Sequence, residues 1–354
     1  MKYSEQKEIL KKVGDISSIY GITDVTYNSG RPKGVRAFEV KNGNGLDLTV
    51  FADRGLDIPL LSFKNKNIGF VSKSGLSSPY LYRYTPDGFD AFLRQFTAGF
   101  LTTCGITYCG APTEEGGKFF PLHGAVSNVP AENVYTKQEV VDDEIILKIC
   151  GDVREACIFS ENMIIHREIS VYTESNKIKI HDTVENRGFK KSPVMMIYHV
   201  NFGYPMLDEG DRIYISTDKV EPQTPFAIEG VDKYSIIEAP EDCREEQCYY
   251  HSSDCEGKSS FAMLHNEKLG MAAVVNYSTK EFPILCEWKS MQSGDYALGL
   301  EPTTNGTHGR TEPTGPVVEL DGQETREFEV VVEFIEDEDM INNLRLKCKE
   351  SKIN

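Results

Sequence analysis

Three short segments of the sequence place acid–base side chains where folding alone does not require them. The first is a histidine–glycine turn, His123-Gly124. The second puts His199 at or near the end of an apolar strand, and the third puts Glu301 at the end of another, directly before Pro302. An imidazole titrates near neutral pH and a carboxylate can accept a proton. The three segments together therefore predict a site that delivers one proton to a substrate and removes another.

Each segment alone has a simpler explanation. A strand-end histidine is commonly a hydrogen-bonded structural residue, and a glutamate before proline commonly marks the exit of a strand. Two histidines and one carboxylate can also form a metal triad, and the chemistry would then be assisted by a Lewis acid. Bound metal in the purified protein would separate the two interpretations. We expect no metal and no cofactor.

The elements that must position these residues are short strands between turn signals. Alternation of apolar and polar residues predicts strands over 45–51, 144–150, 163–169, 177–184, 271–276 and 327–333. Helical spacing is convincing only over 4–13 and 337–350, which predicts minor surface helices at the two termini. The sequence has no dinucleotide fingerprint, no phosphate-binding loop and no strand–helix alternation. This pattern predicts one all-β domain.

The order and spacing of these segments resemble the aldose 1-epimerase (galactose mutarotase-like) superfamily, in an outlying branch. The resemblance rests on His123-Gly124, on His199-Val-Asn-Phe202 and on Leu300-Glu301-Pro302, and it extends over roughly residues 35–335 of a single domain, 1–354. It implies a large antiparallel β-sandwich that holds a sugar in an open groove. The implied activity is that of an isomerase, an aldose 1-epimerase or mutarotase that interconverts the anomers of a free monosaccharide without a cofactor.

The resemblance also implies roles for individual residues. His199 would be the general acid that protonates the ring oxygen, Glu301 the general base that takes the proton of the anomeric hydroxyl, and His123 would hold the sugar near its ring oxygen. Arg94 stands about where the family places a sugar-binding arginine. Glu246 or His251 would replace a sugar-binding aspartate that has no clear match. The candidates for the groove walls are Asn201, Phe202, Tyr204 and Trp288, the only tryptophan.

Composition limits the partners. The formal charge is −17, from 38 basic and 55 acidic side chains, which disfavours nucleic acid and anionic membrane surfaces. Nine cysteines form no C-x-x-C pair, and without an export signal they predict reduced, mostly buried thiols in a cytoplasmic protein. We expect a neutral monosaccharide as partner, and a monomer or a homodimer.

Two other classes of function remain open from the sequence. The same residues could catalyse a different proton transfer on a modified or keto-sugar, as an isomerase or lyase, with or without a metal. The protein could also be a sugar-binding module without turnover. A glycosidase is disfavoured because it needs two carboxylates at the scissile bond, and the sequence offers one well-placed candidate.

Overall fold

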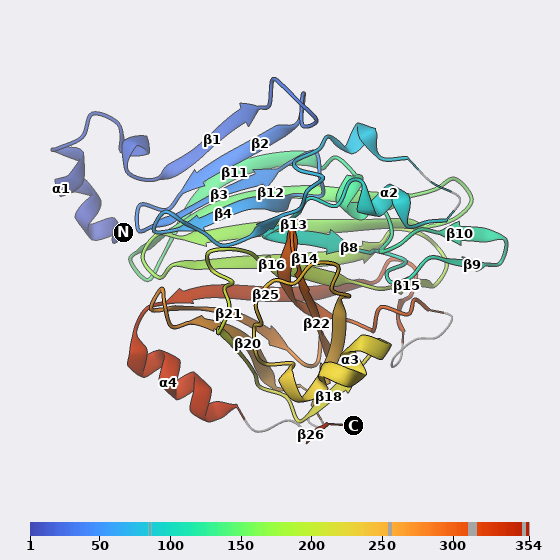
Figure 1. The fold of residues 1–354 in the computed structure, drawn as a ribbon. Helices are drawn as coiled ribbons and strands as arrows, with labels where there is room; N and C mark the ends of the chain where they lie inside the picture. Colours follow the sequence, from blue (N-terminus) through green and yellow to red (C-terminus); the bar gives the residue numbers. More distant parts are fainter. Residues whose placement is uncertain (84, 86, 254–256, 311–316, 349–351, 354) are drawn as a thin grey trace.

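A computed structural model describes residues 1–83, 85, 87–253, 257–310, 317–348 and 352–353. Two large, mainly antiparallel sheets lie face to face and make up most of the molecule (Figure 1). The predicted all-β sandwich is therefore confirmed. In the described part of the chain, no helix is long and apolar enough to cross a membrane.

Within the described residues the first sheet has twelve strands, and it carries His199, Glu301 and Trp288. Eleven follow the order β1-β2-β3-β4-β8-β16-β23-β22-β19-β18-β26, and β5 pairs with β4. Neighbouring strands run antiparallel, whereas β18 and β26 pair in parallel. In sheet order the strands are β1 (Gly21–Thr26), β2 (Arg36–Lys41), β3 (Leu46–Phe51), β4 (Asp57–Phe63), β8 (Leu101–Cys104), β16 (Ile197–Phe202), β23 (Asp295–Thr303), β22 (Ile284–Gln292), β19 (Gln247–Ser252), β18 (Lys219–Pro222) and β26 (Lys352–Ile353), with β5 at Lys66–Asn67.

The second sheet has eight strands in the part of the chain that the structure describes, and it covers the inner face of the first. In sheet order its strands are β11 (Glu132–Val141), β12 (Glu144–Ala156), β13 (Asn162–Tyr172), β14 (Lys177–Asn186), β25 (Thr325–Ile335), β21 (Met271–Ser278), β20 (Ser259–Asn266) and β17 (Arg212–Ile215). Three two-stranded sheets join β6 (Phe70–Val71) to β7 (Ala98–Gly99), β9 (Thr113–Glu115) to β10 (Lys118–Phe120), and β15 (Ser192–Val194) to β24 (Val318–Leu320).

The predicted terminal helices are present but shorter. The first consists of a 3-10 turn, Tyr3–Glu5, followed by α1 (Gln6–Leu10). The second is α4 (Glu338–Lys347), whose first turn is capped by the side chain of Asp337; residues 349–350 of the predicted helix lie outside the described residues. The one-turn helix α2 (Asp90–Leu93) and the short helix α3 (Pro225–Gly230) were not predicted. Further 3-10 turns lie at Ile16–Ser18, Pro79–Leu81, Val126–Asn128 and Val231–Lys233.

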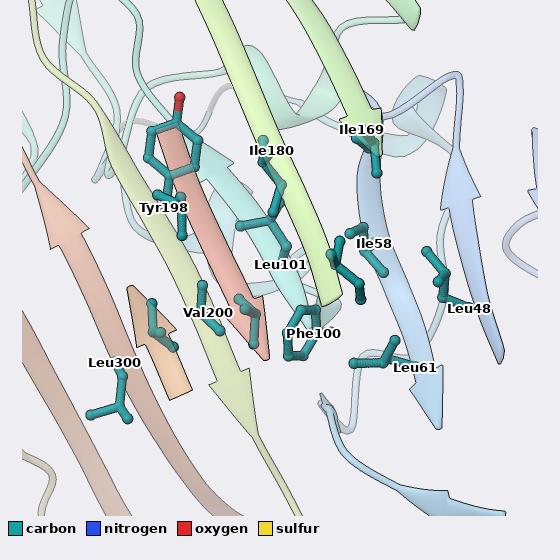
Figure 2. Packing of buried hydrophobic residues seen from close by; sticks show 14 of the residues in the cluster. Leu48, Ile58, Leu61, Phe100, Leu101, Ile169, Ile180, Tyr198, Val200 and Leu300 are labelled. Atoms are coloured by element: carbon teal, nitrogen blue, oxygen red, sulfur yellow. The ribbon is translucent and has the colours of Figure 1, made fainter. Parts of the chain in front are cut away.

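The main core lies between the two sheets because strand side chains alternate between the faces. On β16, Tyr198, Val200 and Phe202 point inward and are fully buried. Figure 2 shows Tyr198 and Val200 among aliphatic side chains from both sheets, including Ile180 and Leu300. His199 and Asn201, which alternate with them, therefore point to the opposite, outer face.

A charged network crosses this apolar core directly behind the candidate site. Arg167 of β13 donates to both carboxylate oxygens of Asp182 on β14, at 2.9 and 2.6 Å. It also donates to the hydroxyl of Thr103 on β8 at 2.7 Å, and Tyr198 of β16 donates to Asp182 at 2.5 Å. All four side chains are buried, so the network fixes β8 and β16 against the second sheet.

Candidate active site

Two cross-strand rows on the outer face of the twelve-stranded sheet bring the candidate residues together. The register aligns one residue of each strand, in the order Thr102 of β8, His199 of β16, Glu301 of β23, Cys286 of β22 and Tyr250 of β19. The adjacent row consists of Asn201, Gly299, Trp288 and Cys248. Residues directly opposite in a sheet share a face, so side chains more than a hundred positions apart in sequence become neighbours.

His199 and Glu301 form a close pair at the centre. The Nδ1 atom of His199 lies 3.2 Å from Oε1 of Glu301 and 2.6 Å from Oδ1 of Asn201. The amide nitrogen of Asn201 donates to the backbone oxygens of His199 and Ala98, at 2.8 and 3.2 Å, so its Oδ1 must be the acceptor. Nδ1 of His199 therefore carries a hydrogen, and the unprotonated nitrogen of the neutral ring is Nε2. Oε1 of Glu301 is buried without a hydrogen-bond partner.

His123 lies beside this pair, at a turn that requires its glycine. Its ring centroid is 6.2 Å from that of His199, and its Nδ1 is buried without a hydrogen-bond partner. The backbone φ angles of His123 and Gly124 are both positive, at 57° and 72°. A Cβ at Gly124 would lie 2.6 Å from the carbonyl oxygens of Gly105 and Tyr108, so only glycine lets this turn approach the floor of the site.

Aromatic rings enclose the three polar side chains. Phe96 packs edge-on against His199 and Trp288, with ring centroids 5.1 and 6.3 Å apart, and Phe92 packs in the same way against His123 at 5.1 Å. As a result His199 is only 5% exposed and Glu301 only 1%. The pair is therefore held in a nearly dry environment.

Burial shifts the acid–base properties of all three residues toward the uncharged form. It lowers the pKa of His199 to about 3, with a further contribution from the charge of His123, and it lowers the pKa of His123 to about 4. Burial raises the pKa of Glu301 well above its ordinary value, and the charge of Glu246 adds to the rise, whereas a hydrogen bond from the Cys286 thiol opposes it. The group can thus hold one neutral carboxylic acid beside neutral imidazoles at physiological pH.

The structure brings His123, His199, Glu301 and Trp288 together but places other predicted residues elsewhere. Phe202 is not a groove wall: it lies in the core between the sheets, because it alternates with Asn201 on β16. Asn201 lines the site, but its amide is fully used within the protein, so it orients His199. Its predicted contact with substrate stays a prediction.

The predicted substrate arginine lies away from the site, whereas the two candidates to replace the family's aspartate differ in position. The side chain of Arg94 is 72% exposed and bonds Asp90, one turn earlier, on the outer side of the segment that carries the two phenylalanines. Glu246 accepts a hydrogen bond from the indole nitrogen of Trp288 at 2.7 Å. His251 is fully buried on the other face of the sheet, paired to Glu287, so it cannot reach the site. Tyr204 follows β16 and is 69% exposed.

Sequence analysis missed Phe92, Phe96 and Gly299. The two phenylalanines are four residues apart, which places both on the inner side of α2 and the turn after it, and this spacing was a usable signal. Gly299 lies two residues before Glu301, so it shares the same strand face. A Cβ there would lie 2.1 Å from Oε1 of Glu301, and the carboxylate therefore occupies the space that glycine leaves open.

The cysteines and the potential metal ligands can be described for most of the chain. Cys104, Cys109, Cys150 and Cys286 are buried, Cys248 and Cys348 are half-buried, and Cys157 and Cys243 are exposed, so burial is less complete than predicted; Cys255 lies outside the described residues. Within the described residues, no group of three or more His, Cys, Asp or Glu side chains is arranged to hold a metal ion.

Comparison with solved structures places the fold. A crystal structure from Klebsiella pneumoniae, provisionally named an aldose 1-epimerase, has a TM-score of 0.86 at 21% identity, over 98% of this chain and 92% of that chain. A galactose mutarotase-like protein from Clostridium acetobutylicum has a TM-score of 0.63 at 16% identity, over 90% and 99%. A galactose 1-epimerase from Lactobacillus acidophilus has a TM-score of 0.57 at 12% identity, over 89% and 99%.

These identities establish the fold, which is that of the galactose mutarotase-like β-sandwich, as the sequence resemblance predicted. No curated protein matches the sequence. One family model, described as a domain of unknown function (DUF4432), matches residues 32–334. Because this match covers most of the sequence, the chain belongs to the DUF4432 family, and its fold is that of the galactose mutarotase-like β-sandwich.

Proposed function

We propose that the protein is an aldose 1-epimerase that interconverts the α and β anomers of a free monosaccharide. The observation that carries the proposal is the buried His199–Glu301 pair, together with two buried polar atoms that have no partner, Oε1 of Glu301 and Nδ1 of His123. Unpartnered buried polar atoms are costly, and hydroxyl groups of a bound sugar would satisfy them. A sugar-binding fold and an acid–base pair inside it support the same conclusion.

The chemistry requires two coordinated proton transfers. Opening a hemiacetal ring needs one proton delivered to the ring oxygen and one removed from the anomeric hydroxyl. Rotation about the C1–C2 bond and reclosure by the reverse transfers give the other anomer. Each positioned acid or base contributes about 10²–10⁴-fold to the rate. These steps use only groups that the site contains.

The directions of the pKa shifts specify how many protons the pair holds. A lowered histidine pKa and a raised glutamate pKa favour a neutral His199 beside a protonated Glu301 in the free protein. The assignment implied by the resemblance, an acidic His199 and a basic Glu301, is the other tautomer: the proton of Glu301 then lies on Nε2 of His199, and the total number of protons is the same. In our proposal Glu301 gives its proton and Nε2 of His199 accepts one during ring opening, and the roles reverse during closure.

Access to the pair requires a change in the aromatic cover. With His199 5% exposed and Glu301 1% exposed, a sugar cannot contact both groups while the ring of Phe96 lies over His199. We therefore propose that Phe96 moves aside on binding and then packs against the apolar face of the sugar, opposite Trp288. Closure of this kind excludes water and strengthens the hydrogen bonds made to the substrate.

The test is anomer exchange measured by NMR at neutral pH on a panel of free aldoses. The proposal predicts accelerated exchange for one or a few sugars. It also predicts a fall of at least about 100-fold in the Glu301→Gln variant, because glutamine can neither give nor take the proton. Glu319→Gln is the matched control, since the side chain of Glu319 is 51% exposed and pairs with Lys191 at the surface.

The possible outcomes separate the remaining classes of function. Sugar binding without any acceleration, unchanged in Glu301→Gln, would identify a binding module. No effect on any simple aldose, with the protein folded, would refute the mutarotase. Modified and keto-sugars would then be tested as substrates for another proton transfer, with the metal content of the purified protein measured in parallel.

A further inference from the structure

Thiols are concentrated around Glu301. Four of the eight described cysteines lie there, namely Cys104, Cys109, Cys248 and Cys286. Cys286 stands directly across from Glu301 in the register, and Cys248 directly across from Trp288. The carboxylate of Glu301 also contributes to raising the pKa of the buried thiols of Cys104 and Cys109, after burial itself, so both lie within its electrostatic range. A glutamate surrounded by sulfur is not a requirement of the sandwich fold.

Two of these thiols almost touch each other. The Sγ atoms of Cys248 and Cys286 are 3.3 Å apart, on neighbouring strands and on the same face of the sheet. Cys248 is half-buried and Cys286 is buried. The thiol of Cys248 is therefore accessible to a small reagent, and the thiol of Cys286 lies beneath it, next to Glu301.

We propose that Cys286 is a positioning residue for Glu301, and that Cys248 and Cys286 form a reversible disulfide that removes Cys286 from this role. The effect on catalysis rests on the proposed function, whereas disulfide formation does not. In the reduced protein Cys286 lies directly opposite Glu301 in the register of β22 and β23, where its thiol is placed to donate a hydrogen bond to the carboxyl group. This contact restrains the carboxyl group and leaves Oε1 free to face the substrate.

The redox step balances with a peroxide as oxidant. The sulfur of Cys248, as a thiolate, attacks one oxygen of hydrogen peroxide, the O–O bond breaks, and a sulfenic acid and one water form after proton transfer. The sulfur of Cys286 then attacks the sulfenic sulfur, forms the S–S bond and releases a second water. Two thiols are oxidised by two electrons, and one peroxide is reduced to two waters. A dithiol reductant reverses the process by thiol–disulfide exchange.

The structural consequence follows from the distances. A disulfide bond is about 2.05 Å long, so the two sulfur atoms, now 3.3 Å apart, must approach by roughly an ångström. Strand β22 carries both Trp288 and Cys286, and it must adjust with β19 to this approach. Cys286 also loses its hydrogen and can no longer donate to Glu301. Oxidation therefore changes the environment of both residues at once.

The first experiment measures the disulfide without any substrate. The reduced full-length protein is titrated with hydrogen peroxide, free thiols are blocked, and peptides are mapped by mass spectrometry, while fluorescence reports on Trp288, the only tryptophan. The proposal predicts a Cys248–Cys286 disulfide, a change in fluorescence, and reversal of both by dithiothreitol. Cys248→Ser should abolish both signals, and Cys157→Ser, which alters an exposed thiol, should abolish neither. The absence of a disulfide, or a disulfide between other cysteines, would overturn the proposed Cys248–Cys286 disulfide.

The second experiment measures positioning through the protonation of Glu301. The carboxyl carbon of Glu301 is followed by ¹³C NMR over a pH range, with Glu301→Gln used to assign the signal. Cys286→Ala removes the donor and should raise the pKa of Glu301 further, whereas Cys286→Ser keeps a donor and should restore the original value. Identical titrations in all three proteins would overturn the positioning role. If anomer exchange is observed, Cys286→Ala should also slow it by roughly five-fold.

Failures of the two proposals can be told apart. If no sugar is turned over, the mutarotase fails, yet the disulfide, the fluorescence and the carboxyl titration still give a result for the thiols. If a sugar is turned over but peroxide leaves the rate and the thiols unchanged, the proposed mutarotase function is supported and the proposed Cys248–Cys286 disulfide fails.

Discussion

Replacing Gly299 by alanine displaces the Glu301 carboxylate without changing its chemistry. The two residues are next but one on β23, and Oε1 of Glu301 rests over the α-carbon of Gly299. An alanine Cβ would lie 2.1 Å from that oxygen, 3.1 Å from the carboxyl carbon and 3.2 Å from the Cβ of Trp288. The first distance is far below any van der Waals contact, so the end of the glutamate side chain must move.

The size of the displacement sets the expected loss of activity. Restoring a normal carbon–oxygen separation of about 3.2 Å or more moves Oε1 by roughly an ångström, and a misplacement of that size can cost about 100-fold in rate. Stability should change little, because the φ angle of Gly299 is not in the left-handed region and most of the displacement falls on the end of the flexible Glu301 side chain, while the Cβ of Trp288 must give by only a few tenths of an ångström. A glycine-to-alanine change also lowers the entropy of the unfolded chain, which stabilises by about 0.4–1 kcal/mol and offsets part of the cost of these contacts.

The measurement is anomer exchange by NMR beside urea denaturation of the same samples. We expect an exchange rate lower by about 100-fold and a free energy of unfolding within roughly 1 kcal/mol of the wild type. Gly14→Ala is the matched control, since a Cβ at Gly14 would meet no atom within 4 Å. A folded Gly299→Ala protein with unchanged exchange would refute the assignment of Glu301 to the reaction, because the carboxylate cannot remain where it is.

Three further predictions concern stability, pH and access. Asp182→Ala leaves Arg167 charged and buried between the sheets, so urea denaturation should show a loss of about 3–5 kcal/mol; a loss below 1 kcal/mol would contradict the structural role of the network. His199 has a folded pKa of about 3, below its unfolded value, so the unfolded state binds more protons than the folded state between pH 6.5 and 3. The free energy of unfolding should therefore fall as the pH drops through that window, and the slope should be shallower in His199→Gln. Phe96→Ala should increase quenching of the tryptophan by acrylamide; equal quenching would show that Phe96 is not its cover.

The class of fold was predictable because strand periodicity is a local property. The strands predicted at 45–51, 144–150, 163–169 and 177–184 all lie within observed strands or begin one residue before them, because a half-buried strand shows alternation directly in its sequence. The helices at 90–93 and 225–230 were missed because one or two turns give no periodic signal. A threonine cap followed by proline, Thr224-Pro225, was the available indication of the second.

The pairing of His199 with Glu301 could be proposed from sequence only by resemblance, since it depends on the register of two strands a hundred residues apart. The face of the sheet on which each residue lies can be predicted from period-two alternation along its strand, but this alternation was not followed through for Phe202. Because His199 was placed in the site, period-two alternation sends Asn201 to the same face and Phe202 to the core, which the assignment of Phe202 to the groove overlooked. The contact between Phe96 and His199 involves a loop, whose path no local pattern specifies.

Alternation along β16 and β8 also explains why the site has a charged network behind it. Tyr198 and Thr103 face inward and bind the Arg167–Asp182 pair, while His199 and Thr102, the next residues on the same strands, face outward. A shift of either strand by one residue would exchange the two sets and expose the network while burying the imidazole in the core. A one-residue slip would move the apolar side chains of each strand to the wrong face, and it would also leave the buried charges without their partners, which adds a large further cost. The costly polar contacts inside the sandwich therefore fix the register on which the acid–base pair outside it depends.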